Sequence, residues 1–322
     1  MRRQKAKSRM TGTHQTNREE RMKEEIGFIG LGAMGSGMAA NLLAKGWPLT
    51  VMAHRKREAI EQLKSLGAGE AATPRELAEA SDVVIFCVTG SEQVQELLSG
   101  PNGILAAGKQ LLIIDCSTSN PAVTIKLVED LARQGITLVD APLARTPKEA
   151  AEGKLDVMAG GSPEAIARAR PILEAFAARI VETGPAGTGH TMKLLNNFVS
   201  MGYSAIYSEA LMIAAKAGLT PQVFDSVLRG SRMDCGFYQA FFDFVLNRNE
   251  NAQRFAMANA LKDMSYLASL AQAVQAVNPV GAAVRNSFAT AVAAGHGQSF
   301  VPALSDVIAS ANGVSLVEAS SR

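Results

Sequence analysis

The sequence predicts an α/β protein in which a doubly wound, mainly parallel sheet is followed by an all-helical part. Three observations predict this fold. Short apolar runs alternate with helical stretches as far as residue 182, the first run leads directly into a glycine-rich turn, and only helical runs follow residue 189. Alternation of this kind is typical of parallel sheets covered by helices on both faces. In such sheets, ligands bind beyond the carboxyl ends of the strands.

The expected elements follow from apolar periodicity and from the turn residues between them. Strands are expected at Ile26–Ile29, Leu49–Ala53, Val83–Val88, Leu111–Asp115, Thr137–Asp140, Leu155–Ala159 and Ile180–Glu182. Helices are expected at Ser36–Lys45, Arg57–Leu66, Pro74–Ala80, Ser91–Leu98, Pro121–Gln134, His190–Ala217, Pro221–Leu228, Phe237–Leu246 and Ala258–Ala276, with others to about Ala311. The helix at 190–217 is apolar on most faces, which indicates a core shared between two subunits.

The first strand runs straight into Gly30-Leu-Gly-Ala-Met-Gly35. A Gly-x-Gly-x-x-Gly turn between a strand and a helix is the pattern of a dinucleotide site, although a glycine turn without a ligand is the alternative. Gly30 permits the tight turn, Gly32 lets the backbone approach a pyrophosphate, and Gly35 lets the helix pack closely. The helix N-terminus offers free N–H groups to the phosphates. We assign the whole turn to coenzyme binding: Gly30, Leu31, Gly32, Ala33, Met34 and Gly35.

The second strand is followed by His54-Arg55-Lys56-Arg57, and no acidic residue stands at its end. An acidic residue there binds the ribose 2′-hydroxyl of NAD, whereas a nearby arginine accommodates the 2′-phosphate of NADP. The cations therefore favour NADP, with Arg55 as the main contact and His54 beside it, while NAD stays possible. The alternative is a solvated basic turn.

Length and charge suggest how the chain is divided. At 322 residues it is long enough for about two domains. We expect a basic extension at 1–24, a Rossmann domain that binds NADP at 25–186, an all-α domain for substrate binding and dimerisation at 187–315, and a tail at 316–322. Residues 1–21 carry a net charge of +5, so the other residues sum to −3. We interpret the extension as disordered; an arm for nucleic acid or an acidic surface is the alternative.

Other classes of protein find little support in the sequence. No run of about 18 apolar residues suggests a membrane span, and the first 21 residues are too polar for a secretory signal. The cysteines, Cys87, Cys116 and Cys235, have no disulfide or metal spacing, and the four histidines lack zinc spacing. We expect a cytoplasmic protein without a metal, and without nucleic acid or membrane as a partner.

Two strand ends carry candidate substrate contacts. Ser117 and Thr118 lie in Asp115-Cys-Ser-Thr-Ser-Asn-Pro121, where their hydroxyls could bind a substrate carboxylate or the nicotinamide ribose. Helix capping by Ser119 or Asn120 explains part of this run equally well. Arg145 stands five residues beyond the strand end at Asp140 and three beyond Pro142. It could bind a carboxylate or sulfonate with two hydrogen bonds, or it could be a surface charge.

The helix after Gly189 carries four polar side chains at steps of three, four and seven, which places them on about one face: Lys193, Asn196, Asn197 and Ser200. Polar groups on an otherwise apolar helix are costly unless they have partners or line a site. Lys193 could donate a proton to the alkoxide that forms when hydride reaches a carbonyl. A lysine with polar neighbours on a solvated face is the alternative.

Four motifs in order resemble the β-hydroxyacid dehydrogenase family: the glycine turn, Asp115 to Pro121, Asp140-Ala-Pro142 with Gly153, and Gly187-Thr-Gly189 through Lys193 to Asn197. The resemblance covers about residues 25–314. It implies a Rossmann domain, an all-α domain, and dimers or tetramers with interlocked helices. It also implies Lys193 as catalytic acid/base, Ser117 and Asn197 in substrate binding, and Thr118 and Lys262 near the coenzyme.

Two departures from the family pattern affect the substrate and coenzyme sites. Val88-Thr89 replaces the usual Leu-Pro at the nicotinamide, and Ala144-Arg145-Thr146 replaces the usual Ser-Gly-Gly. The second change is similar to the Gly-Arg-Thr of sulfolactaldehyde reductases, which also carry Asn and Ser at the positions of Asn196 and Ser200. We therefore expect Arg145, Thr146, Asn196 and Ser200 to bind a strongly anionic substrate terminus.

The sequence thus predicts an NADP(H)-dependent oxidoreductase that interconverts a small anionic semialdehyde and its hydroxy acid, as a homodimer or homotetramer. The semialdehyde is expected to be of the 2-hydroxy-3-oxopropionate or sulfolactaldehyde type. An NAD-dependent dehydrogenase of the 3-hydroxyisobutyrate type is the first alternative. A dinucleotide-binding protein without catalysis is the second.

Overall fold

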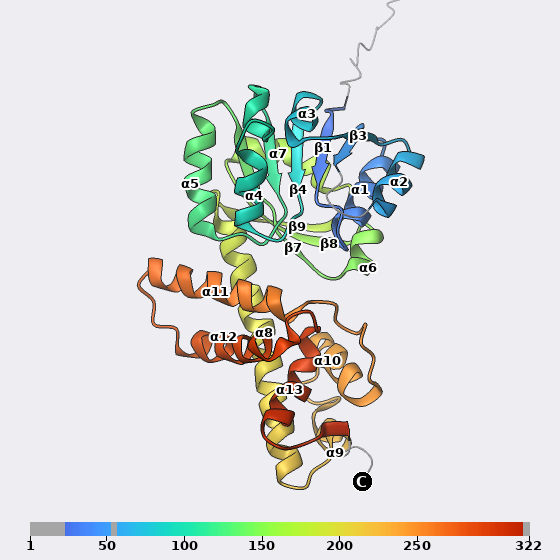
Figure 1. The fold of residues 1–322 in the computed structure, drawn as a ribbon, viewed down its shortest axis with the longest axis vertical. Helices are drawn as coiled ribbons and strands as arrows, with labels where there is room; N and C mark the ends of the chain where they lie inside the picture. The colour runs from blue at the N-terminus through green and yellow to red at the C-terminus, as the bar shows by residue number, and fades with distance from the viewer. Residues whose placement is uncertain (1–22, 53–56, 318–322) are drawn as a thin grey trace, which may run out of the picture.

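The computed structural model describes residues 23–52 and 57–317. It shows a sheet covered by helices, from which one long helix leads into a helical part (Figure 1). The order of the described strands is β3-β2-β1-β4-β5-β6-β8-β7, with β9 beside β8. Their bounds are β1 Ile26–Ile29, β2 Leu49–Met52, β3 Gly69–Ala71, β4 Val83–Phe86, β5 Leu112–Asp115, β6 Thr137–Asp140, β7 Leu143–Ala144, β8 Leu155–Gly160 and β9 Ala177–Gly184.

The sheet is mainly parallel, which confirms the predicted fold class. All pairs from β3 to β6 are parallel, β8 is antiparallel to β6 and β7, and β9 is parallel to β8. Two short strands escaped prediction. The three-residue β3 contains Gly and Glu, and the two-residue β7 is too short for any periodicity, so only pairing with a neighbour makes them strands.

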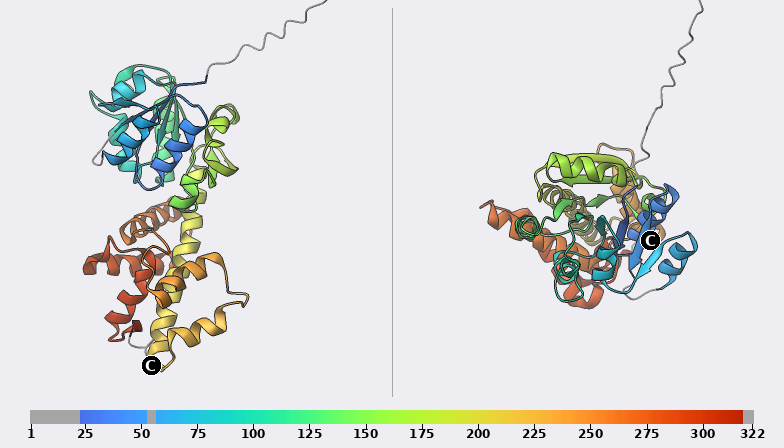
Figure 2. Two further views of the ribbon diagram at one scale, coloured as in Figure 1. Left: turned by 90° about the vertical axis from the view of Figure 1, so that its right-hand side faces the viewer. Right: turned by 90° about the horizontal axis from the view of Figure 1, so that it is seen from above.

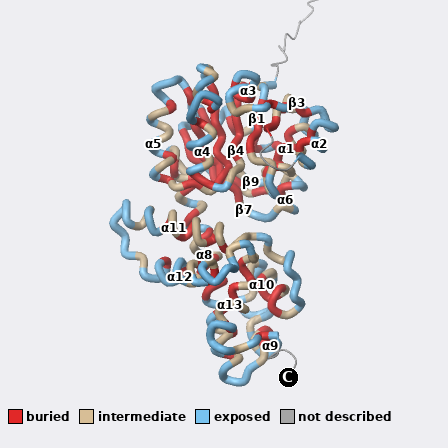
Figure 3. The backbone as a smooth tube through the Cα atoms, viewed as in Figure 1, coloured by how far each residue is buried: buried red, intermediate tan, exposed pale blue. Residues whose placement is uncertain are grey.

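Helices cover both faces of the sheet, as a doubly wound fold requires. Neighbouring strand residues alternate between two cores: Val83 and Ile85 pack with α1, α2 and α7, whereas Val84 and Phe86 pack with α3, α4 and α5. Figure 3 shows the central strands buried between these helices. The helices are α1 Gly35–Ala44, α2 Glu58–Ser65, α3 Pro74–Glu79, α4 Ser91–Leu98, α5 Pro121–Ala132, α6 Pro147–Ala151 and α7 Pro163–Leu173, with a 3₁₀ turn at Ile104–Ala107. Helices α6 and α7 were not predicted, although both begin with a Ser or Thr cap followed by proline.

The second part of the chain is helical and is built around α8 Thr188–Lys216. This 29-residue helix starts beside the sheet and runs through the helical part (Figure 2). The other helices are α9 Pro221–Leu228, α10 Gly236–Asn247, α11 Met257–Ala273, α12 Pro279–Ala291 and α13 Leu304–Ala311, with a π-helical segment at Val292–His296 and a 3₁₀ turn at Val301–Ala303. One core joins α8 to α11, α12 and α13, and a second, rich in aromatic side chains, joins it to α9 and α10.

Helix α8 is only partly covered within one chain. It is long and apolar enough to cross a membrane by length and composition, but 44% of the apolar window is buried inside the protein. The core helix of a globular protein passes the same test. A stripe of large apolar side chains remains exposed along α8: Met192, Leu195, Val199, Tyr203, Ile206 and Ile213. We call these residues the α8 stripe.

Residues just outside the predicted domain limits make contacts with the two domains. Glu24, assigned to the basic extension, forms an ion pair with Arg168 at 2.7 Å, and the Lys23 ammonium lies 5.1 Å from the centre of the Trp47 ring. Leu316, assigned to the tail, is buried in the aromatic core. These contacts are non-local, so no local pattern could indicate them.

Candidate functional site

The glycine turn after β1 has the geometry that its sequence requires. Gly30 has φ +107°, a left-handed conformation that favours glycine. A Cβ on Gly35 would collide with the carbonyl oxygen of Gly30 and lie 3.0 Å from the Phe28 ring, whereas a Cβ on Gly32 would meet nothing within 4 Å. Gly30 and Gly35 are therefore needed for the turn itself, and Gly32 leaves the backbone open to a ligand.

The other residues of this turn support the same arrangement. Leu31 and Met34 pack against the core, while Ala33 is exposed. Met34 stands at the start of α1 and makes no side-chain cap, so N–H groups of the first turn are left for a ligand. An exposed backbone at a helix N-terminus fits the pyrophosphate of a dinucleotide coenzyme.

The residues expected at the 2′-phosphate, His54 and Arg55, lie outside the described residues. The next cation among the described residues, Arg57, forms ion pairs with Glu61 at 2.7 Å and with Glu70 at 3.0 Å. The Arg57 side chain is therefore paired with carboxylates of α2 and β3.

The ends of β4 and β5 are joined by Ser117. Its Oγ accepts a hydrogen bond from the N–H of Val88 at 3.0 Å, and its side chain is almost fully buried, 2% exposed. Asn120 caps α5 by accepting a hydrogen bond from the N–H of Ala122, so the capping interpretation is correct for Asn120. Ser119 instead donates to Asp115 at 3.0 Å.

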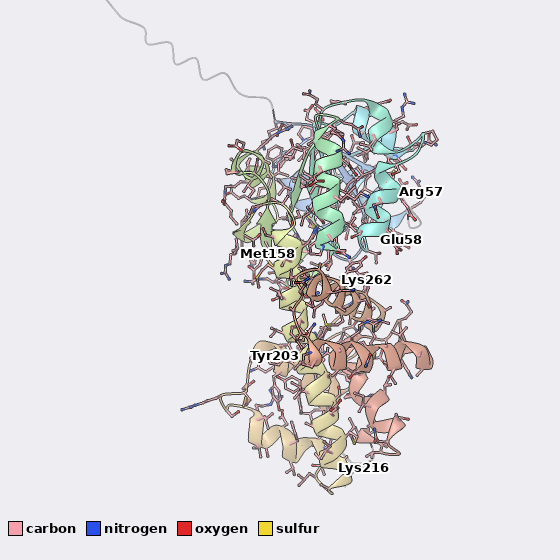
Figure 4. The ribbon with its side chains drawn as sticks, turned by 90° about the vertical axis from the view of Figure 1, so that its left-hand side faces the viewer. Arg57, Glu58, Met158, Tyr203, Lys216 and Lys262 are labelled. Carbon is pink, nitrogen blue, oxygen red and sulfur yellow. The ribbon has the colours of Figure 1, made fainter. Side chains whose placement is uncertain are left out.

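Helix α11 brings a lysine from the helical part to these strand ends. The ammonium of Lys262 donates to the carbonyl oxygens of Thr89 at 2.6 Å and of Thr118 at 2.8 Å. Figure 4 shows Lys262 at the junction between the sheet and the helical part. Lys262, Val88, Thr89 and Thr118 thus lie close together, as their common assignment to the coenzyme site requires.

Asp263 next to Lys262 connects α11 to the polar face of α8. Its buried carboxylate accepts a hydrogen bond from the Asn197 amide at 2.7 Å and lies 3.0 Å from the Lys262 ammonium. Asn197 in turn accepts a weak hydrogen bond from Asn196 at 3.3 Å, and Ser200 donates to the Asn197 carbonyl at 3.1 Å. Asp263 was missed by the sequence analysis, because nothing local marks an acid for burial.

Lys193 lies half-buried on the same face of α8. Burial lowers the pKa of its ammonium below the ordinary value of 10.5; Asp263 raises that pKa and Lys262 lowers it further. The structure therefore brings together Lys193, Asn197, Asp263 and Lys262. A lysine with a lowered pKa can exchange a proton closer to neutral pH than an exposed one.

Among the described residues, the hydrogen bonds and ion pairs of Arg145 and Thr146 go to local partners and not to Lys193, Asn197 or Lys262. Arg145 has φ +84° and forms an ion pair with Asp156 at 2.9 Å on the neighbouring strand β8. Thr146 caps α6 by accepting a hydrogen bond from Lys148 N–H, and its hydroxyl donates to Glu149. Both side chains thus have local partners.

Comparison with known proteins shows which family has this fold and these motifs. A family model described as the NAD binding domain of 6-phosphogluconate dehydrogenase matches residues 25–184. A second, described as the NAD-binding of NADP-dependent 3-hydroxyisobutyrate dehydrogenase, matches residues 187–307. The 3-hydroxyisobutyrate dehydrogenase of Pseudomonas aeruginosa is 36% identical over 272 residues, 82% of this chain and 91% of its own length. The chain belongs to the β-hydroxyacid dehydrogenase family.

Two further proteins similar to this β-hydroxyacid dehydrogenase support the same family. The 3-sulfolactaldehyde reductase of Escherichia coli is 33% identical over 274 residues, 85% of this chain and 92% of its own. The crystal structure of 3-hydroxyisobutyrate dehydrogenase from Salmonella typhimurium has a TM-score of 0.78 and 27% identity, and covers 88% of this chain and 99% of that one. The protein is thus a hydroxyacid dehydrogenase that uses a nicotinamide dinucleotide.

Proposed function

We propose that this enzyme interconverts a small anionic semialdehyde and its hydroxy acid with NADP(H). The observation that carries the proposal is the half-buried Lys193 beside the Asn197–Asp263 hydrogen bond, next to the strand-end contacts of Lys262. The bound nicotinamide supplies or accepts the hydride. Lys193 donates a proton to the substrate oxygen in reduction and removes it in oxidation.

The remaining polar residues bind the substrate. Asn197, held by Asp263, and Ser117 between the strand ends orient the reacting carbon. Arg145, Thr146, Asn196 and Ser200 receive the anionic terminus. The ion pair between Arg145 and Asp156 is half-exposed and therefore weak, so Arg145 can bind the substrate anion either beside Asp156 or in its place.

A preference for NADP rests on the cations after β2, Arg55 above all, and on the NADP-dependent enzyme whose domain model matches the helical part. Coenzyme titration tests it. We expect kcat/KM to be at least tenfold higher with NADPH than with NADH, and Arg55→Ala to remove most of that ratio. A clear preference for NADH contradicts the assignment of Arg55.

The substrate is tested by side-by-side reduction of sulfolactaldehyde, tartronate semialdehyde (2-hydroxy-3-oxopropionate) and succinate semialdehyde. A charge-assisted contact should be worth about 1.5–3 kcal/mol, so Arg145→Ala should lower kcat/KM for the preferred aldehyde about ten- to a hundredfold. Arg133→Ala, at an exposed arginine directly after α5, is the control. Unchanged rates for all three aldehydes exclude Arg145 as a substrate ligand.

A second candidate function is oxidation of a 3-hydroxy acid of the 3-hydroxyisobutyrate type with NAD. The relative from Pseudomonas aeruginosa, 36% identical, favours it. Oxidation of 3-hydroxyisobutyrate with NAD⁺, faster than reduction of each semialdehyde with NADPH, would select this candidate.

The cytoplasm is the predicted compartment, and a homodimer or homotetramer is the predicted assembly. The exposed α8 stripe supports the assembly, because a contiguous apolar patch on a long helix is costly in water.

A further inference from the structure

A buried polar cluster lies at the start of α8, outside the residues assigned to coenzyme or substrate. It consists of Asp115 at the end of β5, Asp140 at the end of β6, Thr124 on α5 and His190 on α8. None of these side chains is more than 2% exposed. Buried polar groups are retained only where hydrogen bonds compensate for lost hydration. The four side chains are therefore expected to hold specific hydrogen-bond partners.

Asp140 fixes the first turn of α8 to the sheet. Its two carboxylate oxygens accept hydrogen bonds from the N–H of Gly187 at 2.7 Å and of His190 at 2.8 Å. The helix approaches so closely that a Cβ on Gly189 would lie 2.5 Å from the carbonyl oxygen of Met158. The position of the α8 N-terminus is therefore set by contacts with β6 and β8.

The His190 ring connects that turn to α5. Its Nδ1 lies 2.8 Å from the Thr124 hydroxyl, and Thr124 itself donates to the carbonyl of Asn120 at 3.3 Å. The tautomer of the imidazole decides whether the ring nitrogen or the threonine hydroxyl donates in the 2.8 Å contact. Asn120 ends the loop that carries Ser117 and Thr118.

The opposite edge of the His190 ring faces Asp115, the residue from which the same loop starts. Nε2 is buried without a hydrogen-bond partner and lies 3.7 Å from an oxygen of Asp115. Asp115 accepts from the Ser117 N–H at 2.9 Å and from the Ser119 hydroxyl at 3.0 Å. The imidazole thus sits between the two groups that hold the ends of residues 117–120.

We propose that His190 is a positioning residue that fixes the loop of Ser117 and Thr118 relative to the helix of Lys193. This role rests on the proposed function of Lys193. His190 precedes Lys193 by about one helical turn, so a displacement at the ring moves the ammonium and the loop relative to each other. A misplacement of about 1 Å costs on the order of a hundredfold in rate.

The test compares two substitutions of His190. His190→Leu removes both ring nitrogens, and we expect kcat to fall at least tenfold while the KM for the coenzyme changes less than threefold. His190→Asn places an amide, which can donate or accept a hydrogen bond, near the Nδ1 position and should restore kcat to within about threefold of wild type. His296→Leu, at an exposed histidine, is the control and should change neither constant.

Hydrogen exchange gives a readout that does not depend on the reaction. In His190→Leu, peptides 111–121 and 186–196 should both exchange faster than in wild type, and His296→Leu should leave both unchanged. Thr124→Val, which removes one hydroxyl of the same hydrogen bond, replaces His190→Leu if that variant does not fold. Unchanged exchange in 111–121, or kcat within twofold of wild type, overturns the role of His190. Absence of turnover in the wild type refutes the proposed function alone.

Discussion

At the scale of single residues, the positive charges of two lysines at the candidate site lie near the negative charge of one carboxylate, Asp263. Lys262 is tied to the sheet by carbonyl oxygens, and Asp263 shares its charge between Lys262 and the Asn197 amide. Lys193 is left half-buried near these charges. Burial and the neighbouring Lys262 lower the pKa of Lys193 more than Asp263 raises it, as the proposed proton transfer requires.

Removal of the Lys193 amine should abolish proton transfer but not coenzyme binding. General acid catalysis is worth about 10²–10⁴ in rate, so Lys193→Met should lower kcat by that factor. Binding of NADPH, measured by fluorescence, should stay within about threefold. Lys216→Met at the exposed end of α8 serves as the control. A kcat within twofold of wild type would contradict the role of Lys193.

The lowered pKa of Lys193 predicts opposite pH dependence in the two directions. Reduction needs the ammonium, so its kcat/KM is full below the pKa and falls as pH rises through it. Oxidation needs the free amine and rises through the same pKa. Because burial lowers that pKa, both changes should begin below the ordinary lysine value of 10.5. Profiles of both reactions check this, and a common direction in both would refute it.

At the scale of elements, the strand–turn–helix unit of β1 and α1 separates packing from ligand binding. A Cβ on Gly35 would collide with the Gly30 carbonyl and crowd the Phe28 ring, whereas a Cβ on Gly32 would meet open space. Two glycines of one motif thus have different reasons for lacking a side chain.

The matched substitutions Gly35→Ala and Gly32→Ala should therefore fail differently. Gly35→Ala should destabilise the fold by about 1–3 kcal/mol, because an overpacked side chain forces the backbone to shift. Gly32→Ala should leave the midpoint of thermal unfolding within about 2 °C and weaken coenzyme binding at least tenfold. Thermal unfolding without coenzyme and coenzyme titration measure the two effects. Equal loss of stability in both variants would contradict this distinction.

At the scale of the whole molecule, α8 connects the sheet to the helical part and exposes an apolar face. The α8 stripe covers much of the helix, and its side chains are 41–60% exposed in the single chain, although Tyr203 also packs against the rings of Tyr207 and Phe237. Burial of such a face by a second copy is favourable by about 25 cal/mol per Å².

Substitution in the α8 stripe should therefore change the oligomeric state. Ile206→Glu puts a charge where we expect apolar contact, and it should shift the protein toward monomers in light scattering after size-exclusion chromatography. Leu66→Glu, at an equally exposed leucine after α2, is the control. If wild type and Ile206→Glu have the same mass, the stripe is not the subunit interface.

Much of the fold could be predicted because its elements carry local signals. Long apolar runs such as β1, β4 and β5 and capped helices such as α5 and α9 lie within a few residues of their predicted bounds. The short strands β3 and β7 and the helix α6 carry weak signals, and β9 is longer than expected. Pairing with neighbours, not composition, makes those segments regular.

The sequence by itself determined the fold class and the candidate groups of the site: the glycine turn, the lysines, the amides and the order of the motifs. These are local properties, written in spacing and residue type. Only the tertiary structure decided which acidic residues contact these groups. Asp263 lies beside the lysines and Asn197, and Asp115 and Asp140 lie beside His190. Burial of a charge depends on contacts between segments far apart in the chain, and no local pattern records those contacts.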